Sequence, residues 1–147
     1  GLVGIEIRDY SKKIVGIDIS HRMLQQAENT KSYDKLVHVD CLEYLRLNDL
    51  DFNCFIAADV FIYIGELDHL FHLVKSKNKR KGKFIFTTEH REEGSYSLEK
   101  SGRFSHSKFY IDDICRRCGF KIVYFKRIPL RFEVNEKIIG GLYILEF

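Results

Sequence analysis

The chain has 147 residues, of which 45% are hydrophobic and 31% are charged. These values lie near the averages of soluble globular proteins, so they exclude a disordered or fibrous chain, and the length suits one domain. The formal net charge of +3 is too small to predict a nucleic-acid or membrane partner by itself.

The cysteines and the apolar runs argue against two further classes, disulfide-rich secreted proteins and membrane-spanning proteins. Four cysteines at irregular spacing are too few for a disulfide scaffold, so we expect a reducing, cytoplasmic location. The longest apolar stretch, residues 55–65, is interrupted by Asp59 and is far shorter than the roughly 20 residues that span a bilayer. This stretch therefore predicts a buried strand.

Strand and helix patterns alternate along the first two thirds of the chain. Residues 2–10 predict a helix, the β-branched run KIVGIDI at 13–19 predicts a strand, and Ser20 precedes a helix over 21–30. The alternation continues with a strand at 36–40, a short helix in EYLRL, a strand at 52–64, a helix at 66–75 and a strand at 83–90. Such alternation predicts an α/β fold with a doubly wound, mostly parallel sheet.

The last third has a different pattern. Residues 91–107 are polar and predict a loop, and Ser107 is placed to cap a helix that ends at Gly119. Two β-rich runs follow, FKIVYFKRIPLRFEV and GGLYILEF, joined by a turn-like segment around residues 135–141. They predict a C-terminal antiparallel hairpin.

We expect residues 1–147 to form a single domain that lacks its first strand. The helix after Gly1 has no strand before it in the sequence. In a doubly wound sheet the first strand is central, so its loss would leave two half-sheets with unpaired inner edges.

Three acidic residues follow successive predicted strands. Asp18, Asp40 and Asp59 each stand at a strand end, and ligands of open α/β sheets bind beyond the carboxyl ends of the strands. A carboxylate after the second strand of such a sheet suits a ribose diol, because it accepts two hydroxyl hydrogen bonds, and Asp40 is placed to accept from an adenine amino group. Each residue alone is better explained as a turn residue at a strand end; the spacing of all three is the signal.

The same residues resemble a known family. GLVGIEIRDYSKKIVGIDISHRML resembles the end of the glycine motif and the acidic second strand of class I S-adenosylmethionine-dependent methyltransferases. HVDCLEYL resembles their adenine-contacting segment, and AADVFIYIGEL resembles the fourth strand of methyltransferases described with TPR repeats. The resemblance implies S-adenosylmethionine as cofactor and methyl transfer to a small-molecule or carrier-bound acceptor.

Position by position, the resemblance also implies a set of site residues. Asp18 would hold the ribose, the first glycine would close the cofactor loop, and Tyr63 would lie at the mouth of the acceptor site. The acidic residue and earlier glycines of the family's loop do not occur in this sequence, which puts cofactor binding in question. The implied cofactor-binding residues are Gly1, Asp18, Ile19, Met23, Asp40, Cys41, Leu42, Asp59 and Val60.

Methyl transfer from a sulfonium is an in-line displacement, so positioning and exclusion of water supply most of the acceleration. A general base is needed when the acceptor must lose a proton, and the candidates are Glu89, His90 and His106, with Tyr63 beside the acceptor. Each histidine is equally open to a structural interpretation. Cys115 and Cys118 have CxxC spacing, but no second pair stands at metal-ligand distance, so no metal is predicted.

Two alternatives stay open. A nicotinamide-dependent Rossmann oxidoreductase also places an acidic residue after its second strand, but Asp40 and the terminal hairpin favour the methyltransferase. A methyltransferase-like binding module without catalysis is the other alternative, and a degenerate glycine loop would favour it.

Overall fold

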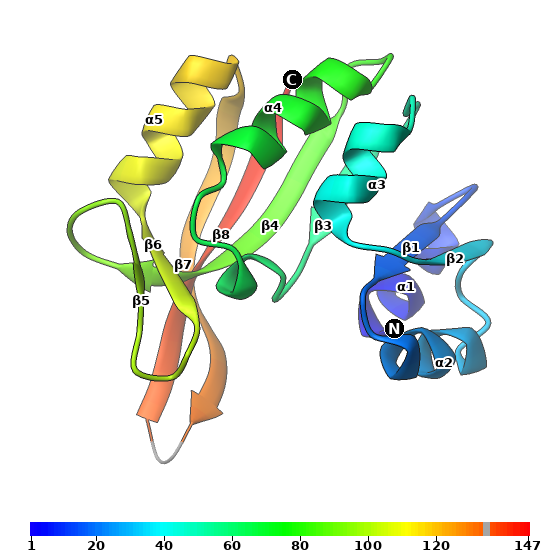
Figure 1. The fold of residues 1–147 in the computed structure, drawn as a ribbon, viewed down its shortest axis with the longest axis horizontal. Helices are drawn as coiled ribbons and strands as arrows, with labels where there is room; N and C mark the ends of the chain where they lie inside the picture. Colours follow the sequence, from blue (N-terminus) through cyan, green and yellow to red (C-terminus); the bar gives the residue numbers. More distant parts are fainter. Residues whose placement is uncertain (134–135) are drawn as a thin grey trace. The chain divides into compact units, whose positions relative to one another are not determined.

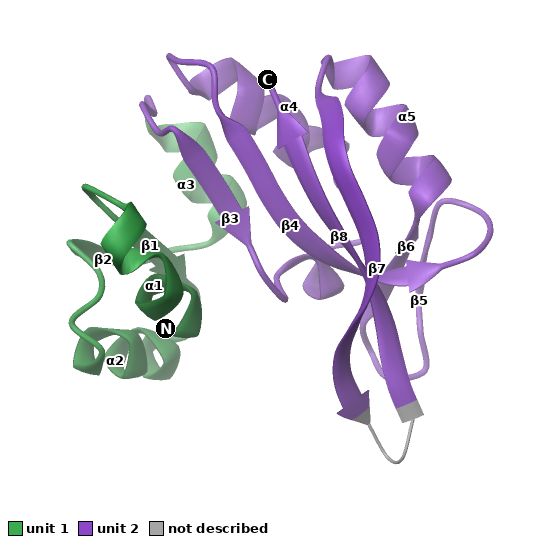
Figure 2. Ribbon diagram, turned by 180° about the vertical axis from the view of Figure 1, so that it is seen from behind, with its two compact units in different colours: residues 1–48 green, residues 49–147 purple. Residues whose placement is uncertain are grey.

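The computed structural model describes residues 1–133 and 136–147, and these form two compact units (Figure 2). Unit 1 spans Gly1–Asn48 and unit 2 spans Asp49–Phe147. Each unit has its own sheet. Whether the chain is a single domain with a further central strand stays a prediction.

Unit 1 is built on two short parallel strands, β1 and β2, with Asp18 opposite His38 at their carboxyl ends. Polar side chains begin the helices that follow each strand: Ser20 accepts a hydrogen bond from the backbone of Met23, and Asp40 caps the third helix in the same way. The elements of unit 1 are α1 (Leu2–Ile7), the 3₁₀ helix η1 (Arg8–Tyr10), β1 (Val15–Asp18), α2 (His21–Asn29), β2 (Lys35–His38) and α3 (Cys41–Leu47).

Unit 2 is a mixed six-stranded sheet with two helices on one face (Figure 1). Strand β4 is central: β3 and β6 pair parallel with its two halves on one edge, and β8 pairs antiparallel along the other edge. The elements of unit 2 are β3 (Cys54–Ala57), η2 (Phe61–Tyr63), α4 (Asp68–Lys77), β4 (Lys83–Arg91), β5 (Tyr96–Leu98), β6 (Phe104–Ser107), α5 (Lys108–Cys118), β7 (Lys121–Glu133) and β8 (Glu136–Glu146).

The core of unit 2 lies between the sheet and the two helices α4 and α5. Alternate side chains of β4 are buried, and Phe84 and Phe86 project toward Phe71 of α4, with ring centroids 5.3 and 5.4 Å away. Tyr143 of β8 stacks on Phe86 at 5.0 Å. This aromatic layer fixes the helices against the sheet and so supports the carboxyl ends of β3 and β4.

Most predicted elements are confirmed. Helix α5 is an example in which the predicted residues form both ends of the helix. The hydroxyl of Ser107 accepts from the backbone N–H of Tyr110, and Gly119 ends the helix at a φ of 72°, where a residue without Cβ is favoured. The predicted C-terminal hairpin is also present, as the antiparallel pair β7 and β8.

Three predicted boundaries are wrong. The strand expected over 52–64 is only β3, which ends at Ala57; Asp59 follows with a φ of 57°, and the chain continues into η2. The loop expected over 91–107 contains β5 and β6, which pair with each other. The turn expected around 135–141 is strand from Glu136 onward, and its first part lies outside the described residues.

Candidate functional site

The loop after β1 carries the first group of predicted cofactor-binding residues. One carboxylate oxygen of Asp18 accepts a hydrogen bond of 2.7 Å from the backbone N–H of Ser20. This bond uses one of the two oxygens and holds the carboxylate at the carboxyl end of β1, beside the start of α2. Asp18 therefore has the fixed orientation that a ribose-binding carboxylate requires.

A small cavity of about 60 Å³ lies in unit 1 against this loop. The sequence did not indicate Tyr33, whose hydroxyl organises one wall: it donates to the carbonyl of Gly1 at 3.3 Å and accepts from the N–H of Gly4 at 3.0 Å. A Cβ on Gly1 would lie 2.8 Å from the backbone of Ala27, so this position needs glycine. The lining residues are Gly1, Gly16, Ile17, Asp18, Met23, Leu24, Ala27, Tyr33 and Leu36. Three predicted residues, Gly1, Asp18 and Met23, are thus brought together.

Two apolar side chains flank Asp18 without being buried. Ile19 is 69% exposed and Met23 is 43% exposed. His38 donates from Nε2 to the carbonyl oxygen of Ile19 at 2.8 Å and so ties the end of β2 to the loop. The arrangement offers an apolar surface beside a carboxylate, which suits a nucleoside.

The second group of predicted residues begins helix α3. One oxygen of Asp40 accepts from the backbone N–H groups of Leu42 and Glu43, at 2.9 and 3.2 Å. Cys41 is half-buried, and burial, aided by the Asp40 carboxylate, raises the pKa of its thiol above the usual value. Asp40 is therefore a helix cap in this structure, and its role toward adenine stays a prediction.

In unit 2 the predicted residues follow strand β3. Asp59 has a φ of 57°, a left-handed conformation that costs energy in any residue with a side chain, and its N–H donates to the hydroxyl of Thr87 at 3.1 Å. Val60 then starts η2, and the ring of Tyr63 at its end is 69% exposed. Strained backbone of this kind concentrates at functional sites.

His106 anchors the segment that carries Tyr63. Its ring is fully buried, stacks on Tyr110 with a centroid distance of 5.9 Å, and donates from Nε2 to the carbonyl oxygen of Gly65 at 2.9 Å. Because Nε2 is the donor, the neutral tautomer is set. A buried ring with this bond supports the loop, and its predicted catalytic role is untested.

Burial also gives His106 a testable effect on stability. Desolvation lowers the pKa of His106 below its ordinary value of 6.5, although the carbonyl oxygens of Gly65 and Ile64 oppose this. Below about pH 6.5 the unfolded chain then binds a proton that the folded chain does not, so stability falls as pH falls. We expect urea titrations to show a larger loss of unfolding free energy between pH 7 and about pH 5.5 for wild type than for His106→Gln. His72→Gln changes an exposed position of α4, so this variant should lose as much unfolding free energy as wild type. An equal loss in wild type, His106→Gln and His72→Gln would show that His106 does not cause the pH dependence.

His90 pairs in register with His106 across β4 and β6. Its side chain is 5% exposed and its Nε2 lies 3.7 Å from the carboxylate of Glu92. Burial, with the nearby positive charge of Arg127, lowers the pKa of His90, which keeps the ring neutral at pH 7. Neighbouring Glu89, the other candidate base, is 12% exposed and bound to Arg131 at 2.7 Å.

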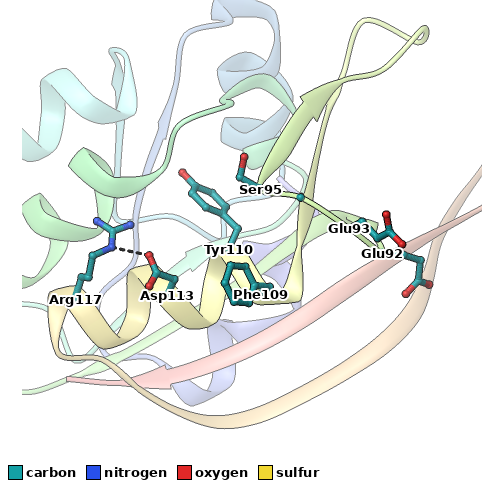
Figure 3. A pocket seen from close by; sticks show the side chains of 8 residues that line it. Glu92, Glu93, Ser95, Phe109, Tyr110, Asp113 and Arg117 are labelled. Atoms are coloured by element: carbon teal, nitrogen blue, oxygen red, sulfur yellow. Dashed lines mark hydrogen bonds and ion pairs between the residues drawn. The ribbon is translucent and has the colours of Figure 1, made fainter.

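A larger hollow of about 520 Å³ opens in unit 2 beside α5 (Figure 3). None of the sequence-predicted site residues lines it, and most of its charges are already paired: Glu92 binds Arg127, and Asp113 binds Arg117. Arg117 also pairs with Asp68 of α4. The lining residues are Glu92, Glu93, Gly94, Ser95, Phe109, Tyr110, Asp113 and Arg117.

Neither metal nor membrane features stand out in the described ranges 1–133 and 136–147. No group of three or more His, Cys, Asp or Glu side chains in these ranges is arranged to hold a metal ion. Burial raises the pKa of Cys115 to about 12, so this member of the CxxC pair is a protonated thiol. Every helix in the same ranges is too short or too polar to cross a membrane.

Comparison with known proteins gives the family. A family model described as a methyltransferase domain matches residues 1–86, more than half of the chain. No curated protein sequence matches significantly.

Many solved structures have a similar fold at low sequence identity. A putative S-adenosylmethionine-dependent methyltransferase from Listeria monocytogenes has a TM-score of 0.77 at 17% identity, covering 99% of this chain and 85% of that one. A methyltransferase from Methanosarcina mazei has a TM-score of 0.73 at 15% identity, covering 97% and 85%. Magnesium protoporphyrin IX methyltransferase from Synechocystis PCC 6803, with bound S-adenosylmethionine, has a TM-score of 0.73 at 17% identity, covering 99% and 64%. The chain therefore belongs to the methyltransferase domain family and has the α/β, Rossmann-like fold of the class I S-adenosylmethionine-dependent methyltransferases.

Proposed function

We propose that the chain binds S-adenosylmethionine and transfers its methyl group to a small-molecule or carrier-bound acceptor. The observation that carries the proposal is the Asp18 loop, where a carboxylate fixed by Ser20 stands beside the exposed side chains of Ile19 and Met23. This arrangement suits an adenosine, because the carboxylate accepts from the ribose hydroxyls while the apolar side chains contact the base. It occurs in a chain whose family and fold are those of methyltransferases.

The roles of the other predicted residues follow from this assignment. In unit 1, Gly1 allows close approach of the backbone to α2, and the segment from Asp40 to Leu42 would surround the adenine. In unit 2, Asp59 and Val60 would contact the methionine end of the cofactor, and Tyr63 would contact the acceptor.

When bound, the cofactor supplies an activated methyl group on a sulfonium. The chain's contribution is to orient the acceptor and to exclude water, and Tyr63 is exposed on a segment that His106 holds in place. If the acceptor must lose a proton, we propose His90 as the base, because its ring is neutral and its nitrogen lies near the Glu92 carboxylate. An acceptor that reacts as a neutral amine needs no such base.

The fold alone leaves the reaction open. The [4+2]-cyclase SpnF has a TM-score of 0.71 to this chain at 12% identity, so a similar framework accompanies a different chemistry in that protein. Two other similar structures are N-methyltransferases: NodS from Bradyrhizobium japonicum, and 1,6-didemethyltoxoflavin-N1-methyltransferase from Burkholderia thailandensis, which has 1,6-didemethyltoxoflavin and S-adenosylhomocysteine bound. The small molecule bound to the second of these supports a small acceptor for this chain.

A turnover experiment tests the proposed reaction. The protein is incubated with methyl-labelled S-adenosylmethionine and fractionated cell metabolites, and S-adenosylhomocysteine and labelled products are measured by mass spectrometry. We expect formation of S-adenosylhomocysteine that depends on one acceptor fraction, with a product heavier by one methylene unit. Tight cofactor binding without transfer to any acceptor in a broad panel would contradict catalysis and favour the non-catalytic binding module.

A further inference from the structure

Arg131 of the C-terminal hairpin reaches the end of strand β3. Its guanidinium lies 2.7 Å from the carboxylate of Glu89 and 3.7 Å from that of Asp59. The side chains of Arg131 and Glu89 are 18% and 12% exposed, whereas that of Asp59 is 55% exposed. Partial burial of the first pair makes it stronger than an ordinary surface ion pair. A cation from the end of the chain is thus held beside a predicted cofactor-binding residue.

An irregularity in β7 directs Arg131 to this place. Pro129 pairs with Ile139 of β8, but Arg131 pairs with the adjacent Ile138, so Leu130 is an extra residue in the strand. Because successive strand residues point to opposite faces, one extra residue reverses the face on which Arg131 lies. Such bulges are common beside active sites, where they redirect a side chain.

Strand β8 lies between β7 and β4 (Figure 1) and has a glycine, Gly140, where it pairs with Glu89 of β4. Gly140 is opposite Glu89, two residues from Ile138, and therefore on the same face as Arg131. A Cβ on Gly140 would lie 2.2 Å from the side chain of Leu130, so glycine at this position leaves room for Leu130. Gly140 thus accommodates the bulge, and the residue that follows the bulge, Arg131, binds Glu89 on the neighbouring side of β8.

Asp59 needs such support because its conformation is unfavourable. A left-handed φ is uncommon in residues with a side chain, and it persists where neighbouring contacts hold it. Thr87 holds the backbone N–H and Arg131 attracts the carboxylate. The same guanidinium thus contacts the carboxylates of both Asp59 and Glu89.

We propose that Arg131 is a positioning residue, which holds Asp59 in the conformation that presents it to the methionine end of the cofactor. The cofactor part of this inference rests on the proposed function, and the positioning part does not. Arg131 acts through Asp59 because its own guanidinium is already bound to Glu89.

The positioning role is tested first in the ligand-free protein by hydrogen exchange of residues 57–64. We expect the amide of Asp59 to exchange about tenfold faster in Arg131→Met, a size typical of coupled contacts. Arg131→Lys, which keeps one charge, should show an intermediate rate. Arg127→Met is the matched control, because Arg127 lies on the same strand and binds Glu92 through two hydrogen bonds away from Asp59. Unchanged exchange of the buried Phe86 amide verifies folding in every variant.

A double-mutant cycle then separates action through Asp59 from a general loss of packing. In an Asp59→Asn background, the further change Arg131→Met should have little added effect on this exchange. Full additivity, or equal exchange in Arg131→Met and Arg127→Met, would overturn the proposal.

The final arm measures S-adenosylhomocysteine affinity by calorimetry. We expect about a tenfold loss in Arg131→Met and none in Arg127→Met. If wild type binds no S-adenosylhomocysteine while the exchange results hold, the proposed function fails and the positioning role stands. If wild type binds but Arg131→Met binds equally well, the cofactor part of this inference is contradicted.

Discussion

Replacing Asp18 with asparagine is expected to weaken S-adenosylhomocysteine binding roughly 100-fold, because hydrogen bonds to a charged group contribute about 1.5 to 3 kcal/mol. Asparagine keeps an oxygen that accepts from the Ser20 N–H, so the loop should retain its conformation. It removes the negative charge and one of the two acceptor oxygens for the ribose hydroxyls. Isothermal titration calorimetry measures the effect directly.

Asp9→Asn is the matched control for this experiment. Asp9 is exposed on η1 in the same unit, so its replacement should leave the affinity unchanged. Circular dichroism and thermal unfolding of both variants exclude a folding defect. Equal affinity of Asp18→Asn and wild type would show that Asp18 does not hold the ribose.

The largest effect on stability is expected for Phe71→Ala, with a loss of about 3 to 5 kcal/mol in the free energy of unfolding. The ring of Phe71 is fully buried, and its centroid lies within 5.4 Å of the rings of Phe84, Phe86 and Phe120. Truncation would leave a cavity where α4 packs on the sheet, and the surrounding aromatic rings are too rigid to fill it. Urea denaturation measures the loss.

Phe109→Ala provides the control, since this substitution removes the same atoms as Phe71→Ala but from an exposed position. Its ring is 76% exposed on α5, so the change should stay within about 0.5 kcal/mol. If both variants lose the same stability, the aromatic layer between α4 and the sheet does not stabilise unit 2 as described.

Local sequence signals predicted the helices and most strands because their causes are local. Ser20 and Ser107 cap the helices that the sequence predicts after them, and the β-branched run before Asp18 is strand β1. The errors arose where pairing with a strand distant in sequence determines the secondary structure. The polar segment 91–107 has weak strand propensity, yet β6 forms there because it completes the edge of β4. Gly140 and Gly141 suggested a turn, but they are strand residues that make room for Leu130 and Tyr143.

The candidate site was predictable in part for the same reason. Asp18 at the end of β1 and Met23 in α2 are close in sequence, so the strand and the helix that follows it bring both to one cavity. Tyr33 binds Gly1 and Gly4, and His38 binds the carbonyl oxygen of Ile19, across 19 to 32 positions of sequence, which no motif encodes. Arg131 lies 72 positions after Asp59, and its orientation depends on a bulge that propensities do not reveal.

The most direct test of the central claim is a pair of titrations of the wild-type protein, one with S-adenosylhomocysteine and one with NAD. Both ligands contain an adenosine, so a nucleoside site alone does not discriminate between them. A methyltransferase of this family should bind S-adenosylhomocysteine, and the Asp18→Asn variant should lose that binding. Tight binding of NAD without binding of S-adenosylhomocysteine would contradict the proposed function and favour the oxidoreductase alternative.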